Sequence, residues 1–442
     1  MKKSRILLLI LTVIILGAMV GCSKSAPDTR DQANEPYQFR SEELENYVIV
    51  YSENDPEYAA LANRLTDHIL QKYNKFVGTA RDTDDTSGKH RILLGDTSHC
   101  DQQGRIMEYT ITVAEDQFII CAGGLFSAEK AVDYLCEQLF NGEAFALDEG
   151  EYHQASFLTT SQAVTDGSSA RIMTANVLAD AFADSSYRNA HYRAEIFAGM
   201  LISYTPDVLG LQETDENWGP ALDLYLAKIE ALYGIVYAKH QDTYQDKTNY
   251  TSLLYRADKF KVESSGVYVF DWWTDEAFQH NYHMRNISWA QFVPLENAEK
   301  PFIVANTHWS YRTEHADGYT YLYGSDYPIA LNELREQCKN ETRTFMTTLR
   351  QTYLETPIIM TGDFNTSLSF FTESEWTPTA FRVISEEAKN NGKAISLVPL
   401  SGHFDHLFGT GNYSIDLYGF FGEDNYHALL TDHPFAYADL SF

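Results

Sequence analysis

The feature that most constrains the fold of this chain is a series of short apolar runs beyond residue 170, each ending in a polar residue able to bind a metal ion or a phosphate. Continuous apolar runs suit strands buried inside layered sheets, and polar groups at strand ends can converge on one rim of a sheet. The runs are Arg171-Ile-Met-Thr-Ala-Asn176, Asp207-Val-Leu-Gly-Leu-Gln-Glu213, Phe302-Ile-Val-Ala-Asn-Thr-His308 and Pro357-Ile-Ile-Met-Thr-Gly-Asp363-Phe-Asn365, followed by Ser414-Ile-Asp416 and Thr431-Asp432-His433-Pro434.

One such motif alone is weak evidence, because Gly, Asp and Asn in Gly-Asp-Phe-Asn also favour ordinary turns. Together and in this order, the motifs resemble the endonuclease/exonuclease/phosphatase superfamily, which includes DNase I. The resemblance covers the chain from about Arg171 to Phe442, and Arg285-Asn-Ile-Ser-Trp-Ala290 looks like the Arg-bearing strand of many secreted members. It implies an α/β fold, a four-layer α/β/β/α sandwich, with the activity of a phosphoester hydrolase.

Phosphoester hydrolysis needs a water in line with the leaving oxygen and a positive charge near the phosphoryl oxygens, which a divalent cation held by carboxylates supplies. The resemblance implies that Glu213 is the first metal ligand, with Asn176 beside it and Asp432 on the opposite side. Mg²⁺ or Mn²⁺ is the expected ion, with Ca²⁺ as an alternative. Asp363 and Asn365 lie two residues apart on an extended segment and therefore point the same way. In the family this pair orients the attacking water and contacts the phosphate.

His433 and His308 are the candidate groups for proton transfer and phosphate binding, since imidazole titrates near neutral pH. The resemblance implies that Asp416 orients His433, and it leaves open whether His433 or Asp363 is the general base. Arg285 is a candidate phosphate clamp, because a guanidinium can engage two phosphate oxygens at once; the alternative is a surface ion pair.

Residues 37–158 predict a separate small α/β domain. A β-type run at residues 47–51 precedes helical periodicity over 57–73, and a strand at 91–95, a hairpin over 109–121 and a helix over 127–140 follow. This order loosely resembles the noncatalytic domains that precede catalytic domains in some glycoside hydrolases. A ligand-binding module, a spacer and a support for the next domain all remain open. Residues 159–169 have the composition of a linker, so the catalytic domain is expected over 170–442.

The N-terminus has the pattern of a secretory signal. Lys2, Lys3 and Arg5 precede an apolar run over 6–16, and the segment ends in Met-Val-Gly-Cys22. This ending resembles a bacterial lipobox, in which Cys22 receives a lipid; an ordinary signal peptide is the alternative. We therefore expect a signal peptide over 1–22, a flexible tether over 23–36, and a protein anchored by lipid to a bacterial cell membrane, facing outside the cytoplasm.

Composition limits the substrate only partly. The chain has 33 Lys and Arg against 62 Asp and Glu, a formal net charge of -29, which disfavours nonspecific nucleic-acid binding through a basic face. The expected substrate is a phosphoester in a nucleic acid, a lipid head group or a sugar phosphate, with a nuclease slightly favoured and a monomer expected. The alternative is a noncatalytic surface lipoprotein that binds glycan or another ligand on an inactive hydrolase scaffold. An aromatic group could stack on substrate or be buried in the core: Phe270, Trp272, Trp273, Tyr282 and Trp309.

Overall fold

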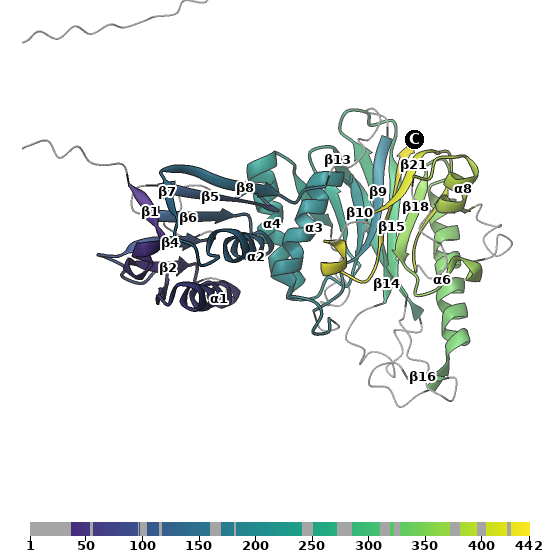
Figure 1. Cartoon of the computed structure of the whole chain (residues 1–442). Coiled ribbons are helices and arrows are strands. Elements are labelled where there is room, and N and C mark those ends of the chain that lie inside the picture. The colour runs from purple at the N-terminus through teal and green to yellow at the C-terminus, as the bar shows by residue number, and fades with distance from the viewer. Residues whose placement is uncertain are drawn as a thin grey trace, which may run out of the picture. The chain divides into compact units, whose positions relative to one another are not determined.

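The computed structural model describes residues 37–53, 56–95, 97, 104–114, 117–159, 169–180, 183–240, 251–271, 285–309, 319–321, 328–371, 381–395, 404–421 and 426–442 (Figure 1). Residues 37–442 form one compact unit. The proposed lipid attachment site Cys22, the tether and most of the linker lie outside the described residues, as do Trp272, Trp273 and Tyr282. Within the described ranges, no helix is both long and apolar enough to cross a membrane.

The segment from residue 37 to residue 158 contains a six-stranded mixed sheet in the order β3-β2-β4-β6-β5-β8. The buried run Tyr47–Tyr51 forms a central strand, parallel to both of its neighbours, as its continuous apolar sequence predicts. The elements are β1 (Gln38–Arg40), η1 (Ser41–Asn46), β2 (Tyr47–Tyr51), α1 (Pro56–Tyr73), β3 (Gly78–Arg81), β4 (His90–Leu94), β5 (Glu108–Ala114), β6 (Gln117–Ala122), α2 (Leu125–Tyr134), the π-helical turn η2 (Leu135–Leu139), β7 (Ala146–Asp148) and β8 (Gly150–Ser156). The strands and helices expected from the sequence in this segment are therefore present.

The rest of the unit is built on two further six-stranded sheets, ordered β11-β12-β10-β9-β22-β21 and β13-β14-β15-β18-β20-β19. The first contains β9 (Ser169–Asn176), β10 (Val208–Gln212), β11 (Tyr237–His240), β12 (Leu253–Arg256), β21 (Ser414–Phe421) and β22 (Phe435–Ser441). The second contains β13 (Phe260–Val269), β14 (Asn286–Pro294), β15 (Phe302–His308), β18 (Ile358–Asp363), β19 (Arg382–Val383) and β20 (Asp405–Thr410). Other elements are α3 (Ala190–Tyr204), α4 (Trp218–Tyr233), β16 (Tyr319–Tyr321), β17 (Pro328–Ala330), α6 (Leu331–Thr352), η3 (Leu368–Phe370), α8 (Ile384–Asn390) and η5 (His427–Leu429).

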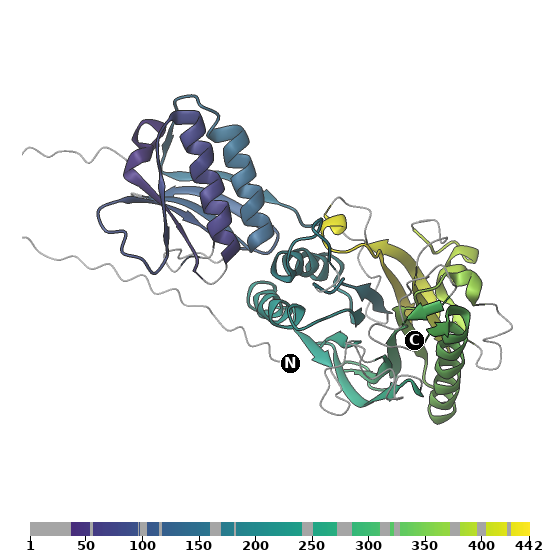
Figure 2. The same cartoon turned by 90° about the horizontal axis from the view of Figure 1, so that it is seen from below.

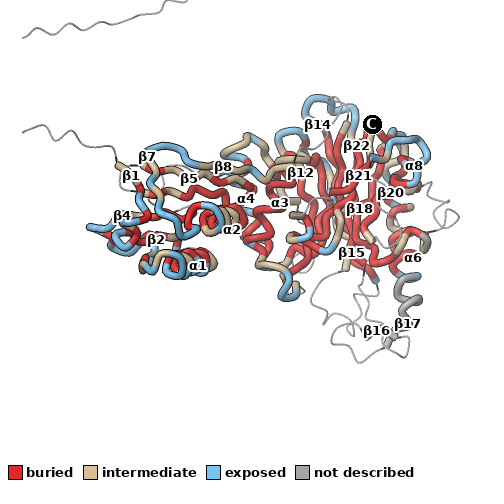
Figure 3. The backbone as a smooth tube through the Cα atoms, viewed as in Figure 1, coloured by how far each residue is buried: buried red, intermediate tan, exposed pale blue. Residues whose placement is uncertain are grey.

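Alternation of side chains along the strands explains how these sheets pack. Ile172 of β9 joins a core between the sheets with Phe292 and Val304, whereas its neighbour Met173 packs with Phe197 of α3 on the outer face. The second sheet likewise places an outer face against α6. Helices therefore cover both outer faces, which Figures 1 and 2 show, and the central strands are buried on both sides (Figure 3). The expected four-layer α/β/β/α arrangement is confirmed.

A buried carboxylate joins the N-terminal segment to the first helical layer. Glu195 of α3 accepts hydrogen bonds from the backbone N–H groups of Met107 (3.1 Å), Phe126 (2.8 Å) and Ser127 (3.3 Å), and from the Ser127 hydroxyl (2.6 Å). Its carboxyl group therefore lies at the N-terminal end of α2, and burial raises the pKa of this carboxyl. The boundaries predicted for separate domains at residues 158 and 170 stay a prediction.

Candidate active site

The polar residues predicted from the strand ends lie above a buried polar layer between the two sheets. Gln212 donates to the side-chain oxygen of Asn306 at 2.6 Å, and Thr361 donates to the same oxygen at 3.1 Å. Asn306 in turn donates to the backbone oxygen of Leu211, at 2.8 Å, in the facing sheet. Gly210 makes this approach possible, since a Cβ there would lie 2.1 Å from the Thr361 hydroxyl oxygen. This layer fixes the spacing of the sheets one step below the site.

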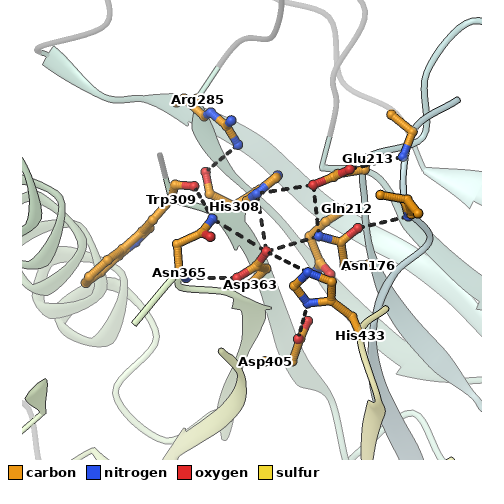
Figure 4. Close-up of polar contacts among 12 residues, drawn as sticks. Asn176, Gln212, Glu213, Arg285, His308, Trp309, Asp363, Asn365, Asp405 and His433 are labelled. Atoms are coloured by element: carbon orange, nitrogen blue, oxygen red, sulfur yellow. Dashed lines mark hydrogen bonds and ion pairs between the residues drawn. The ribbon is translucent and has the colours of Figure 1, made fainter. Parts of the chain in front are cut away.

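Strand register brings the ends of these strands together. β9 and β10 are parallel, with Asn176 opposite Gln212, and β15 and β18 are parallel, with His308 opposite Asp363. The antiparallel strand β20 places Asp405 opposite Asp363. Parallel strands have their carboxyl ends on the same side of a sheet. The ends of β9 and β10 therefore face the ends of β15 and β18 across the site (Figure 4).

Two buried carboxylates and one amide form the centre of the site. The Asn176 amide nitrogen donates to Glu213 Oε1 and to Asp363 Oδ2, each at 3.0 Å. The Asn176 Oδ1 accepts from the backbone N–H of Leu178, and Glu213 Oε2 accepts from that of Ala179, also at 3.0 Å. Glu213 has a φ of 64°, which is unusual for a residue other than glycine and is common at functional sites. In this arrangement Asn176 presents a donor to both carboxylates.

His308 completes one of two clusters that could hold a metal ion in the described part of the chain. Its Nε2 lies 3.4 Å from Asp363 Oδ2 and 3.8 Å from Glu213 Oε1. The other cluster is Asp363, Asp405 and His433, and in both clusters the ligand atoms lie within 4.8 Å of one another.

The residue that orients His433 is Asp405, which the sequence analysis missed. His433 Nδ1 lies 2.7 Å from Asp405 Oδ2, and the aspartate is 1% exposed. The prediction that Asp416 orients His433 is wrong: Asp416 accepts hydrogen bonds from the hydroxyls of Ser169, at 2.8 Å, and Ser441, at 2.5 Å. Ser169 begins β9 and pairs with Ser441, whereas Asn176 ends β9. Asp416, near the start of the antiparallel strand β21, therefore lies at the opposite end of the sheet from Asn176. The sequence gives little signal for this strand, because Asp405 begins the run Asp-His-Leu-Phe-Gly-Thr410, in which only two residues are large and apolar.

Burial and neighbouring charges set the ionisation of the site. It raises the pKa of the Asp363 carboxyl to about 6, against the opposing effect of the His433 charge. Burial also raises the pKa of Glu213 and of Asp405. Burial disfavours a charged His433, but the negative charges of Asp405 and Asp363 outweigh it and raise the His433 pKa well above its usual value. Three carboxylates so close together, in little solvent, are an environment that favours a bound cation.

The segment after Asp363 forms a tight polar turn. The backbone N–H of Asn365 donates to Asp363 Oδ1 at 2.8 Å, and the Asn365 amide donates to the backbone oxygen of Trp309 at 2.9 Å. Asn365 has a φ of 48°, a conformation in which Asn is several-fold enriched. His406 supports the turn from the next strand, with its Nε2 3.0 Å from the backbone oxygen of Thr366.

The remaining predicted residues lie at the margin. Arg285 precedes β14 and places Nη1 3.5 Å from the backbone oxygen of His308, so its side chain reaches the rim of the site (Figure 4). Asp432 lies beside His433, with 3.8 Å between its Oδ1 and Nε2, but its side chain is 58% exposed and belongs to neither cluster. Trp309 and Phe270 are core residues, with 1% and 0% exposure.

The donor set fits a hard divalent cation. Mg²⁺ and Mn²⁺ prefer carboxylate oxygens, and the facing oxygens of Glu213 and Asp363 provide two in a buried site. The pair already carries unfavourable like charge, which a cation between or beside the oxygens would relieve. These two carboxylates, with His308 adjacent, are the residues that would hold the ion.

Two facing sheets with acidic and histidine side chains gathered at their edges define a hydrolase of the DNase I-like class. The sequence model of the Endonuclease/Exonuclease/phosphatase family matches residues 173–416, more than half of the chain, and the protein belongs to this family. Its members are phosphoester hydrolases that are typically dependent on a divalent metal. No curated protein matches the chain.

Several solved structures resemble 62% of this chain. An endonuclease/exonuclease/phosphatase from Bacteroides vulgatus has 20% identity, a TM-score of 0.46 and coverage of 100% of that chain. Danio rerio TDP2 in complex with a single-strand DNA product has 16% identity, a TM-score of 0.42 and 100% coverage. A mannosyl-6-phosphatase from Bacteroides thetaiotaomicron has 16% identity, a TM-score of 0.43 and 100% coverage.

Proposed function

We propose that this protein is an extracytoplasmic, divalent-metal-dependent phosphoesterase that hydrolyses phosphodiester or phosphomonoester bonds, with nucleic acid as the first substrate class to test. The observation that carries the proposal is the joint burial of Glu213, Asp363 and His308 beside the hydrogen-bonded pair of Asp405 and His433. Burying several ionisable groups at one point costs folding free energy, so such clusters are typical of active sites. An inactive scaffold would have no need to keep all of these groups.

The pair of His433 and Asp363 is suited to handle the proton of an attacking water. His433 Nε2 and Asp363 Oδ2 are 4.0 Å apart, and two atoms at this separation can both hydrogen-bond one water molecule. Asp405 holds His433 Nδ1, which fixes the ring so that Nε2 faces Asp363. Through this arrangement the pair orients the water and takes its proton as the new phosphorus–oxygen bond forms. The bond from phosphorus to the leaving oxygen breaks, and that oxygen takes up a proton from the pair or from solvent.

Arg285 and His308 are the proposed donors to the phosphoryl group. His308 Nε2 faces the two carboxylates, and the Arg285 guanidinium lies at the rim, where it can engage phosphoryl oxygens. A bound divalent ion would supply positive charge to the phosphoryl oxygens.

The location of the protein is part of the proposal. The basic residues, apolar run and Met-Val-Gly-Cys22 ending support export and lipid attachment, which would place the enzyme on the outer side of a bacterial cell membrane. Labelling with a radioactive fatty acid tests it: wild type should be labelled and Cys22→Ser should not.

Activity is tested with the fragment from residue 23 onward, in Mg²⁺, Mn²⁺ or Ca²⁺ and in chelator, across DNA, RNA, bis-p-nitrophenyl phosphate, sphingomyelin and sugar phosphates. We expect metal-dependent hydrolysis of one class, with losses of at least about 100-fold in Glu213→Gln and Asp363→Asn. Unchanged turnover in both variants, or turnover in chelator equal to that in metal, would contradict the proposed site. Absence of hydrolysis across the panel in a folded protein would favour a binding function.

A further inference from the structure

A buried arginine outside the catalytic cluster bonds to two loops that contact this cluster, the loop after β9 and the loop before β22. We propose that Arg193 of α3 is a positioning residue that sets the metal-binding carboxylate Glu213 and the proton-handling residue His433 in register with each other. The side chain of Arg193 is fully buried. This inference rests on the proposed function of the site.

The first loop bonded by Arg193 holds the side chains at the centre of the site. Arg193 Nη1 donates to the backbone oxygens of Val177, at 2.9 Å, and Leu178, at 2.7 Å. The next backbone N–H, that of Ala179, donates to Glu213 Oε2, and the Leu178 N–H donates to Asn176 Oδ1. The backbone that orients Asn176 and Glu213 is therefore itself fixed by the guanidinium.

This loop contains a strained residue that needs such support. Leu178 has a φ of 57°, in the left-handed region, which a residue other than glycine rarely adopts and keeps only when the surrounding structure holds it there. Its backbone oxygen accepts from Arg193 and also from the indole nitrogen of Trp218 at 3.0 Å. The guanidinium carbon lies 5.1 Å from the centre of the Trp218 ring, so the ring also fixes the plane of the guanidinium.

The second loop carries His433. Arg193 Nη1 donates to the backbone oxygen of Leu430 at 3.1 Å. The next residue, Thr431, donates its hydroxyl to the backbone oxygen of Asn176 at 2.9 Å and accepts from the backbone N–H of His433 at 3.2 Å. One guanidinium thus ties the loop after β9 to the loop before β22, on which the imidazole is placed.

The remaining donors of Arg193 anchor it to the segment just before its own helix and to the first loop. Nε donates to the backbone oxygen of Arg188 at 2.9 Å, and Nη2 forms an ion pair with Asp180. Lysine has a single ammonium group and cannot place donors in these three directions at once. Replacement by lysine should therefore keep the charge and release one of the two loops.

The chain offers a matched control in Arg171. This second arginine is 1% exposed, forms two bonds with Asp439 at 2.7 and 2.8 Å, and donates to the backbone oxygen of Tyr204 at 2.7 Å. Its guanidinium lies over the ring of Tyr437, at 4.9 Å, as that of Arg193 lies over Trp218. Arg171 is similarly buried and hydrogen-bonded, but it lies toward the opposite end of β9 from Asn176, and these bonds hold it to β22 and to the end of α3.

The test compares Arg193→Lys with Arg171→Lys by thermal unfolding, Mn²⁺ binding and steady-state kinetics. We expect both to lower Tm, but only Arg193→Lys to lower kcat and Mn²⁺ affinity, each by about 10- to 100-fold, the size found for residues that orient metal ligands. KM should change less than kcat. Equal losses of kcat and Mn²⁺ affinity in the two variants, or no loss in Arg193→Lys, would overturn the proposal.

Two further measurements keep the outcome decisive. If Arg193→Lys does not fold, Trp218→Phe removes the indole bond to Leu178 and part of a buried ring, so we expect a lower Tm together with a several-fold fall in kcat. Unchanged kcat in this variant would count against Arg193 acting through this loop. If the wild-type protein hydrolyses none of the substrates tested, the proposed function fails, whereas the difference in Mn²⁺ affinity between Arg193→Lys and Arg171→Lys still decides the positioning role.

Discussion

Replacing Asp405 by Asn is the sharpest test of the site, because the structure and the sequence motifs disagree about which aspartate orients His433. The substitution keeps the size of the side chain and removes the charge that lies 2.7 Å from His433 Nδ1. A buried hydrogen bond to a charged partner contributes about 1.5–3 kcal/mol, and each 1.4 kcal/mol corresponds to a tenfold change in rate. If the whole of this interaction is made in the transition state, kcat should fall by about 10- to 150-fold.

Asp416→Asn is the matched control. Asp416 bonds two serine hydroxyls, and an Asn oxygen can still accept from one of them, so we expect kcat within about twofold of the wild-type value. The assay is metal-dependent hydrolysis of the best substrate of the panel at saturating Mg²⁺ or Mn²⁺, with Tm measured on each variant. Wild-type kcat in Asp405→Asn together with a large loss in Asp416→Asn would refute the assignment and restore the one favoured by the sequence.

Three further predictions concern stability. Burial lowers the pKa of His427 to about 4, so below pH 6.5 the unfolded chain binds a proton at this residue and the folded chain does not. The free energy of unfolding should therefore fall by up to about 3 kcal/mol between pH 6.5 and 4. Urea titration should show a smaller fall in His427→Phe. Glu195→Gln should lower the free energy of unfolding by about 1–3 kcal/mol, because an amide N–H₂ then faces the N–H donors at the start of α2, while kcat is unchanged. Gly210→Ala should lower the free energy of unfolding by about 1–3 kcal/mol and also reduce kcat, because the added methyl group would push the two sheets apart at Thr361. A fully active and stable variant would show that the sheets do not need this close approach.

The strands, and the strand ends at which polar groups gather, could be predicted from the amino-acid sequence. Alternation places Asn176, His308 and Asp363 on the face that continues the core between the sheets, and an apolar run that stops at a polar residue marks the rim. These signals are local, and the four-layer fold was predicted from the family resemblance that the motifs carry together. The small N-terminal sheet followed from the same kind of local pattern.

Which of two similar aspartates faces His433 could be learned only from the folded chain. Asp405 and Asp416 both lie in short apolar strands, but β20 pairs with β18 beside the site, whereas β21 pairs with β22 at the edge of the other sheet. Strand order depends on long-range pairing, which residue type and spacing do not specify. For the same reason Arg193 has no signal of its own in the sequence: its role comes from backbone oxygens of two loops about 250 residues apart, and only folding brings these oxygens within hydrogen-bonding distance of one guanidinium.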